Sequence, residues 1–101
     1  MRTSYSFRGE LWHYPEASGW HFITLPRDLA DELGDAAAPF AKAFGSVKVT
    51  ASIARQRWST SLFPDSRSGS YLLPVKKAIR TAAHIRAGDE VDVELELEPG
   101  G

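Results

Sequence analysis

The feature of this chain that most constrains its fold is a short pattern that occurs twice. In each copy an aromatic-led strand runs into a Leu-Pro step, which is followed by a short amphipathic helix and a glycine. The first copy spans residues 20–34 with its step at Leu25-Pro26, and the second spans residues 71–88 with its step at Leu73-Pro74. An internal echo of this kind predicts two similar halves that close around one core.

Alternating apolar and polar residues predict short strands around the two copies. The expected strands cover residues 4–12, 20–25, 46–54, 58–63 and 91–97. Helices are expected over residues 27–33, ending at Gly34, and over residues 75–83, with Val75, Ile79 and Ala82 on the buried face. Strands of this length do not bury their inward faces as an open sheet. The sequence therefore predicts a mainly β fold, a small pseudo-two-fold β-barrel capped by two short helices.

The connections are less regular than the strands. Residues 35–45 are rich in alanine but contain Pro39, which predicts a connector with one helical turn. Arg55-Gln56 is expected to make a tight hairpin connection whose turn type the sequence leaves open, and residues 64–70 are expected to form a polar loop.

The composition indicates one globular domain. A length of 101 residues fits a single domain over residues 1–101, with its core at about 4–98 and a tail at 99–101. The absence of cysteine excludes disulfides, thiolate nucleophiles and Cys-based metal sites, which favours a reducing compartment such as the cytoplasm. No apolar run has the length of a signal peptide or a membrane span, so we expect no membrane association. Because both half-motifs lie in one chain, we expect a monomer.

Charge is unevenly distributed along the chain. Residues 55–86 contain seven basic residues and one acidic residue, Asp65, and the remaining residues contain five basic and twelve acidic ones. The two parts therefore carry net charges of +6 and −7, although the whole chain carries −1. Two interpretations stay open: the basic segment is a binding face, or the acidic last strand lies beside it and neutralises it.

Motifs for catalysis and metal binding are absent from the sequence. It has no nucleophile elbow, no phosphate-binding loop and no dinucleotide fingerprint. The spacing of His13 and His21 matches no helical or hairpin pair, and His84 ends a helix, so no metal site and no cofactor are predicted. The carboxylates of residues 89–98 alternate along a strand and are expected to form a solvated face.

One group of residues combines cations with aromatic rings near the second copy. If the strand of Trp58 pairs with the strand of Tyr71, these groups are expected to converge at one end of the barrel and to suit an anionic or aromatic ligand. The candidate ligand-binding residues are Arg57, Trp58, Ser61, Tyr71, Lys76, Lys77 and Arg80. The alternative is that Trp20, Trp58 and Tyr71 fill the core while the cations stay solvated, with Arg80 tied to a carboxylate.

Residues 44–53, 58–64 and 69–80 resemble the DUF1905 family of uncharacterised bacterial domains, and the resemblance runs from about Ser6 to Glu96. The family is similar in fold to double-split β-barrels such as the AbrB and MraZ transcription factors, which carry a comparable step, basic helix, Gly-Asp and strand. The sequence departs from the family at residues 54–57, where a glycine-containing turn is usual. The resemblance implies a scaffold and no settled activity.

Two functions follow as expectations. The first is a non-catalytic binding barrel for an anionic small molecule or a protein partner, and the alternative is an AbrB-like protein associated with nucleic acid. A third, less favoured class is an enzyme that uses Lys77, Tyr71 and Arg80 for acid–base chemistry.

Overall fold

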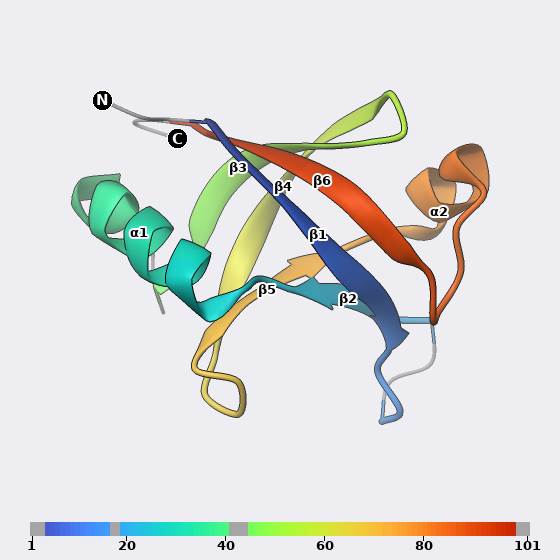
Figure 1. The fold of residues 1–101 in the computed structure, drawn as a ribbon, viewed down its shortest axis with the longest axis horizontal. Coiled ribbons are helices and arrows are strands. Elements are labelled where there is room, and N and C mark those ends of the chain that lie inside the picture. Colours follow the sequence, from blue (N-terminus) through green and yellow to red (C-terminus); the bar gives the residue numbers. More distant parts are fainter. Residues whose placement is uncertain (1–3, 17–18, 41–44, 99–101) are drawn as a thin grey trace.

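The computed structural model describes residues 4–16, 19–40 and 45–98, whose strands form a closed antiparallel barrel (Figure 1). In chain order the elements are β1 (Ser4–His13), β2 (His21–Thr24), α1 (Arg27–Ala37), the 3-10 helix η1 (Ala38–Phe40), β3 (Val47–Ile53), β4 (Gln56–Asp65), β5 (Ser70–Pro74), α2 (Lys77–Ala83) and β6 (Glu90–Leu97). Around the barrel the order is β1, β2, β5, β4, β3, β6. The predicted mainly β barrel with short helices is confirmed. The predicted tail, 99–101, and part of the predicted connector, 41–44, lie outside the described residues.

Two strands change partners along their length. β1 pairs with β6 through residues 4–10 and with β2 through residues 11–13. β4 likewise pairs with β3 through residues 56–62 and with β5 through residues 63–65. Gly9 lies just before the change in β1, and a Cβ there would come within 2.7 Å of an isoleucine methyl group of β2. The missing side chain therefore lets β2 lie close against the β1 backbone.

The strand order shows the pseudo-two-fold relation of the two halves, because exchanging β1 with β4, β2 with β5 and β3 with β6 leaves that order unchanged. Backbone hydrogen bonds between β2 and β5 give the residue correspondence. The Leu25 amide donates to the Tyr71 carbonyl, and the Val75 amide donates to the His21 carbonyl, both at 3.0 Å. The Val75 amide of the second half thus makes the same contact with the first half that the Leu25 amide makes with the second. Val75 is therefore the structural counterpart of Leu25. The echo in the sequence matches Leu25 with Leu73 instead, so it is shifted by two residues from the spatial repeat.

The core lies where the alternation predicts it. The inward residues of β3 and β6 are all buried, and they are Val47, Val49, Ala51, Ile53, Val91, Val93, Leu95 and Leu97. Tyr5 and Leu11 of β1 join the same cluster. α2 begins at Lys77 and not at Val75 as predicted, so Val75 lies before the helix. Val75 and Ile79 are buried as expected, but Ala82 is exposed.

The two helices lie on opposite sides of the barrel (Figure 1). α1 does not end at Gly34 as predicted but continues to Ala37. A Cβ at Gly34 would lie 3.2 Å from the Tyr71 hydroxyl, so this glycine makes room for the tyrosine and does not terminate the helix. Within the described residues, no helix is both long and apolar enough to cross a membrane.

The β3–β4 hairpin turns at Ala54-Arg55, one residue earlier than predicted. Ile53 pairs with Gln56, which leaves two residues in the turn. Both have positive φ, 48° at Ala54 and 70° at Arg55, as in a type I′ turn. Non-glycine residues pay a steric cost in this conformation, so the turn is the strained point of the hairpin.

β4 extends two residues further than predicted, through Pro64 and Asp65. Pro64 pairs with Tyr71, whose carbonyl is turned toward β2 and accepts the Leu25 amide. Residue 64 is therefore at a position where no amide has to donate a hydrogen bond to β5. Pairing between β4 and β3 has already ended at Leu62, so no amide is needed on that side either. A proline is tolerated there, although the sequence pattern predicts a loop at this position.

Candidate functional site

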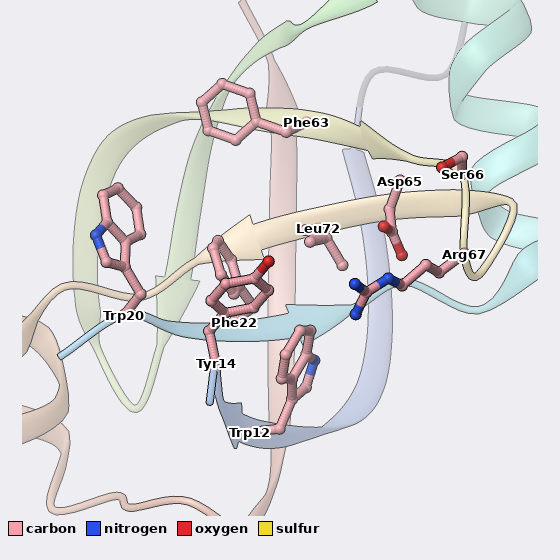
Figure 2. A pocket seen from close by; sticks show the side chains of 9 residues that line it. All are labelled: Trp12, Tyr14, Trp20, Phe22, Phe63, Asp65, Ser66, Arg67 and Leu72. Carbon is pink, nitrogen blue, oxygen red and sulfur yellow. The ribbon is translucent and has the colours of Figure 1, made fainter. Parts of the chain in front are cut away.

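An aromatic groove of about 490 Å³ lies on the outer face of the sheet formed by β1, β2, β5 and β4 (Figure 2). We call it the aromatic groove and define it by its lining residues, which are Trp12, Tyr14, Trp20, Phe22, Phe63, Asp65, Ser66, Arg67 and Leu72. Its volume falls in the range of small-molecule sites.

The strand register gathers these rings on one face. Trp12 lies opposite Phe22, and Phe63 lies opposite Leu72. Alternate residues of a strand point to opposite faces, so burying Leu11 inside the barrel turns Trp12 outward. The same alternation in the other three strands supplies the remaining apolar wall.

Phe22 is the centre of the aromatic cluster. Its ring centroid lies 5.4 Å from that of Trp12, 5.7 Å from that of Trp20 and 6.0 Å from that of Tyr14. Trp20 is stacked on Phe22 at 19°, and Tyr14 meets it edge-on at 87°. The Trp12 Nε1–H donates to the Thr24 hydroxyl at 3.0 Å. These contacts hold the groove wall in place before any ligand is bound.

The two ends of the groove differ in chemistry. Trp20 lies at one end, and Asp65 and Arg67 lie at the other, with the Arg67 guanidinium directed back over the groove (Figure 2). The Asp65 carboxylate accepts hydrogen bonds from the Ser68 amide at 3.1 Å and the Ser68 hydroxyl at 2.8 Å, which orders the turn after β4. Among the described residues, Arg67 makes one ion pair, a long contact of 3.8 Å with Glu16. The polar end therefore presents a weakly paired cation.

The candidate residues predicted from the sequence do not line the aromatic groove. The expected pairing of β4 with β5 is present, but it joins the far part of β4, so Tyr71 lies opposite Pro64 and not beside Trp58. Trp58 and Lys76 do come together in a smaller hollow of about 290 Å³, which adjoins the groove through Trp20 and Phe63.

The other candidates are dispersed over the barrel. Arg57 pairs with Glu96 at 3.1 Å on another face, and Ser61 lies opposite Lys48 of β3. Tyr71 packs toward α1 at Gly34.

The α2 candidates lie on the other side of the barrel from α1 (Figure 1). Lys77 is exposed at the start of α2. Arg80 donates to the carbonyls of Val75 at 3.1 Å and Gly19 at 3.3 Å, so the expectation that it is tied to a carboxylate is wrong. The proposed acid–base trio of Lys77, Tyr71 and Arg80 is therefore divided between the two sides.

The alternative in which three aromatic residues fill the core holds for one of them. Trp58 is buried and belongs to the core cluster, and Tyr71 is half-buried against it. Trp20 is 53% exposed, so its assignment to the core is wrong.

The sequence did contain a signal for the groove. Trp12 occupies an outward position in the alternation that places Tyr5 and Leu11 inside the barrel. Two aromatic residues two positions apart occur around the end of β1, Trp12 and Tyr14, and again around the start of β2, Trp20 and Phe22. The pairing of His13 with His21 makes these aromatic residues neighbours. His13 and His21 therefore do form a cross-strand pair, and the prediction that their spacing matches no hairpin pair is wrong.

A second outer surface carries the charges. This charged face consists of the outward residues of β6 and β3 and of the parts of β1 and β4 that pair with them, residues 4–10 and 56–62. Its ion pairs join Arg8 to Glu90 and Asp92, and Arg57 to Glu96. The hydrogen bond to Asp92 is the main reason that the pKa of Arg8 is raised. Hydrogen bonds from Thr50 and Ser59 lower the pKa of Glu98.

The acidic last strand neutralises only part of the basic segment. β6 lies between β1 and β3, so its Glu96 pairs with Arg57 of β4 across β3. Its Asp92 pairs with Arg8, which lies outside the basic segment. The exposed β6 carboxylates alternate with buried residues as predicted.

A family model decides what this barrel is related to. The model of the domain of unknown function DUF1905 matches residues 7–95, which is most of the chain. The chain belongs to the DUF1905 family. The comparison with curated proteins finds no match. Membership of DUF1905 therefore agrees with the predicted resemblance and assigns no activity to the groove.

Proposed function

We propose that this DUF1905 domain is a binding module whose aromatic groove takes a flat aromatic molecule that carries a carboxylate or phosphate group. The observation that carries the proposal is the juxtaposition of five aromatic side chains with the guanidinium of Arg67 in one groove. Ligand sites commonly combine mostly apolar walls with a few placed polar groups, and this groove has that composition.

The walls suit a planar ring. Trp20 is 53% exposed and Phe63 is 44% exposed, so both offer apolar surface that a ligand would cover. Stacking or edge-on contact between rings contributes about 1 kcal/mol per pair beyond the buried area. Because Trp12, Tyr14 and Trp20 already pack on Phe22, ligand binding would order few additional side chains.

The polar end suits an anion. An arginine guanidinium binds carboxylate and phosphate through paired hydrogen bonds. Arg67 is 76% exposed at its side chain, and its contact with Glu16 is 3.8 Å long. Such a contact is weak, so a ligand anion would replace it at little cost.

Tryptophan fluorescence tests the proposal, because Trp12 and Trp20 line the groove. Aromatic carboxylates and nucleoside monophosphates are titrated beside their uncharged amides or nucleosides. The expected result is binding of at least one anion, with weaker binding of its neutral counterpart. Trp20→Ala and Arg67→Ala are each expected to weaken binding about tenfold.

Arg57→Ala is the matched control. Arg57 is also an exposed arginine in one ion pair, but it lies on the charged face. Equal loss of affinity in Arg57→Ala and Arg67→Ala would contradict the proposal, as would a screen in which no compound binds. Glu16→Gln is expected to strengthen binding of the anion a few-fold, because it removes the competing carboxylate.

Association with nucleic acid is the second candidate, and the exposed lysines Lys76 and Lys77 beside the smaller hollow favour it. Aromatic stacking next to cations is the usual way to bind single strands. Electrophoretic mobility shifts at two salt concentrations test it. Retardation that weakens with salt would support it, and none at micromolar protein would reject it.

A further inference from the structure

We propose that His13 and His21 form a two-imidazole site for a divalent transition-metal ion, with Cu²⁺, Ni²⁺ and Zn²⁺ as its candidates. The two residues lie directly opposite each other on β1 and β2. Their ring centroids are 4.9 Å apart and the ring planes are inclined at 48°. The site is separate from the aromatic groove and does not depend on the function proposed for it.

The backbone pairing brings the two side chains close. The Tyr14 amide donates to the Trp20 carbonyl at 2.9 Å, so Tyr14 and Trp20 form a hydrogen-bonded pair. Antiparallel pairs alternate, so the next pair, His13 and His21, is the non-hydrogen-bonded kind, whose side chains approach most closely. The His21 carbonyl accordingly turns away from β1 and accepts the Val75 amide.

Alternation also places the pair on the side of the hairpin away from the groove. Trp12 and Phe22 are the neighbours of His13 and His21 in the chain, and both line the groove. Since consecutive strand residues point to opposite faces, the imidazoles project from the other side. His13 is exposed and His21 is half-buried, so an ion has access from solvent.

One imidazole is already held in a suitable tautomer. The Nδ1 of His21 lies 3.1 Å from the Gly19 carbonyl oxygen. A carbonyl only accepts, so Nδ1 carries the proton in this contact and Nε2 of the neutral ring keeps its lone pair. Hydrogen bonds of this type orient metal-binding histidines.

The donor set limits the ion and its coordination. Neutral imidazole nitrogens favour borderline ions, with Cu²⁺ bound most tightly among the divalent first-row metals. In the parts of the chain that the structure describes, no group of three metal-binding side chains occurs, so the remaining positions are left to water or to an external ligand. Arg80 shares the Gly19 carbonyl at 3.3 Å, and its charge weakens cation binding without removing either imidazole.

Titration with Cu²⁺ in a non-coordinating buffer tests the site, followed by calorimetry and electron paramagnetic resonance. The intact protein is expected to bind one ion with a spectrum that shows two imidazole nitrogens. His13→Gln and His21→Gln are each expected to weaken this binding about 100-fold, because a chelate gains from the effective concentration of its second arm. His84→Gln is the matched control and is expected to leave affinity unchanged.

Three results would overturn the site. They are a spectrum with a single imidazole nitrogen, a loss of less than fivefold in either single variant, and an equal loss in His84→Gln. The spectrum of the intact protein decides the question without any variant. Far-ultraviolet circular dichroism confirms that the variants fold, and the glutamine side chain preserves polarity at these accessible positions.

Discussion

The aromatic groove and the charged face are two outer surfaces of one barrel, and they use their side chains in opposite ways. On the charged face, Arg8 reaches Asp92 at 3.0 Å and Arg57 reaches Glu96 at 3.1 Å, so cations and carboxylates satisfy one another within the chain. In the groove, Trp20 and Phe63 keep about half of their surface in water. The inward alternation is the same behind both surfaces. The residues inside the barrel therefore determine the fold. The outward residues determine whether a surface satisfies its own charges, as on the charged face, or exposes apolar area to a ligand, as in the groove.

The largest expected effect comes from exchanging one outward residue of β1 on each surface for alanine. Trp12→Ala removes a half-buried indole that packs on Phe22 and donates to Thr24, and we expect a loss of about 2 kcal/mol in the free energy of unfolding. Arg8→Ala removes only solvent-exposed ion pairs and is expected to leave the denaturation midpoint nearly unchanged. Urea denaturation of both variants measures the difference in their free energies of unfolding, and equal losses of stability would contradict the prediction.

A smaller effect is expected at the β3–β4 turn, which joins two strands of the charged face. Arg55→Gly places at φ 70° the residue that tolerates this conformation best, and it should stabilise the protein by about 1 kcal/mol. The thermal midpoint should rise accordingly. Arg57→Gly, two residues away in an extended strand, is the matched control and should destabilise. A lower midpoint in Arg55→Gly would contradict the type I′ assignment.

The smallest expected effect depends on pH. Hydrogen bonds from Thr50 at 2.7 Å and Ser59 at 2.8 Å lower the pKa of Glu98 in the folded protein, so its charged form is favoured by folding. This contribution is present above the ordinary pKa of 4.5 and is lost as the pH falls through the lowered value. Glu98→Gln should therefore be less stable than the intact protein at pH 7, and this difference should shrink as the pH falls below 4.5. Urea denaturation of both proteins at pH 7 and at pH values below 4.5 measures the difference, and a gap that stays constant with pH would refute the prediction.

Sequence patterns predicted the interior better than the surface. Alternation in β3 and β6 identified every buried position there, because a half-buried strand exposes its period directly. The groove required the register of β1 against β2, which joins residues across an irregular connection and is set by tertiary packing. Without that register, one of the two open interpretations of the sequence places Trp20 in the core with other aromatic residues.

The ligand-binding residues predicted from the sequence do not converge, because the β4–β5 pairing occurs at a different part of β4 than Trp58. β4 does pair with β5, but only through residues 63–65, so Trp58 and Tyr71 lie at different places on the barrel. Alternation of apolar and polar residues predicts which face of the sheet a side chain lies on. It does not predict which part of a long strand pairs with the neighbouring strand. Gly34 shows the same limit, since its helical role depends on the Tyr71 hydroxyl, which is remote in the sequence.

The strand order has a consequence for folding. β6, from the second half of the chain, lies between β1 and β3 of the first half, and β3 lies between β4 and β6 of the second. The last strand of each half, β3 or β6, thus pairs with strands of the other half, and neither half can form its sheet alone. We expect the chain to fold in one cooperative transition with many contacts distant in sequence, and fragments cut between β3 and β4 to stay unfolded apart and regain structure only when mixed.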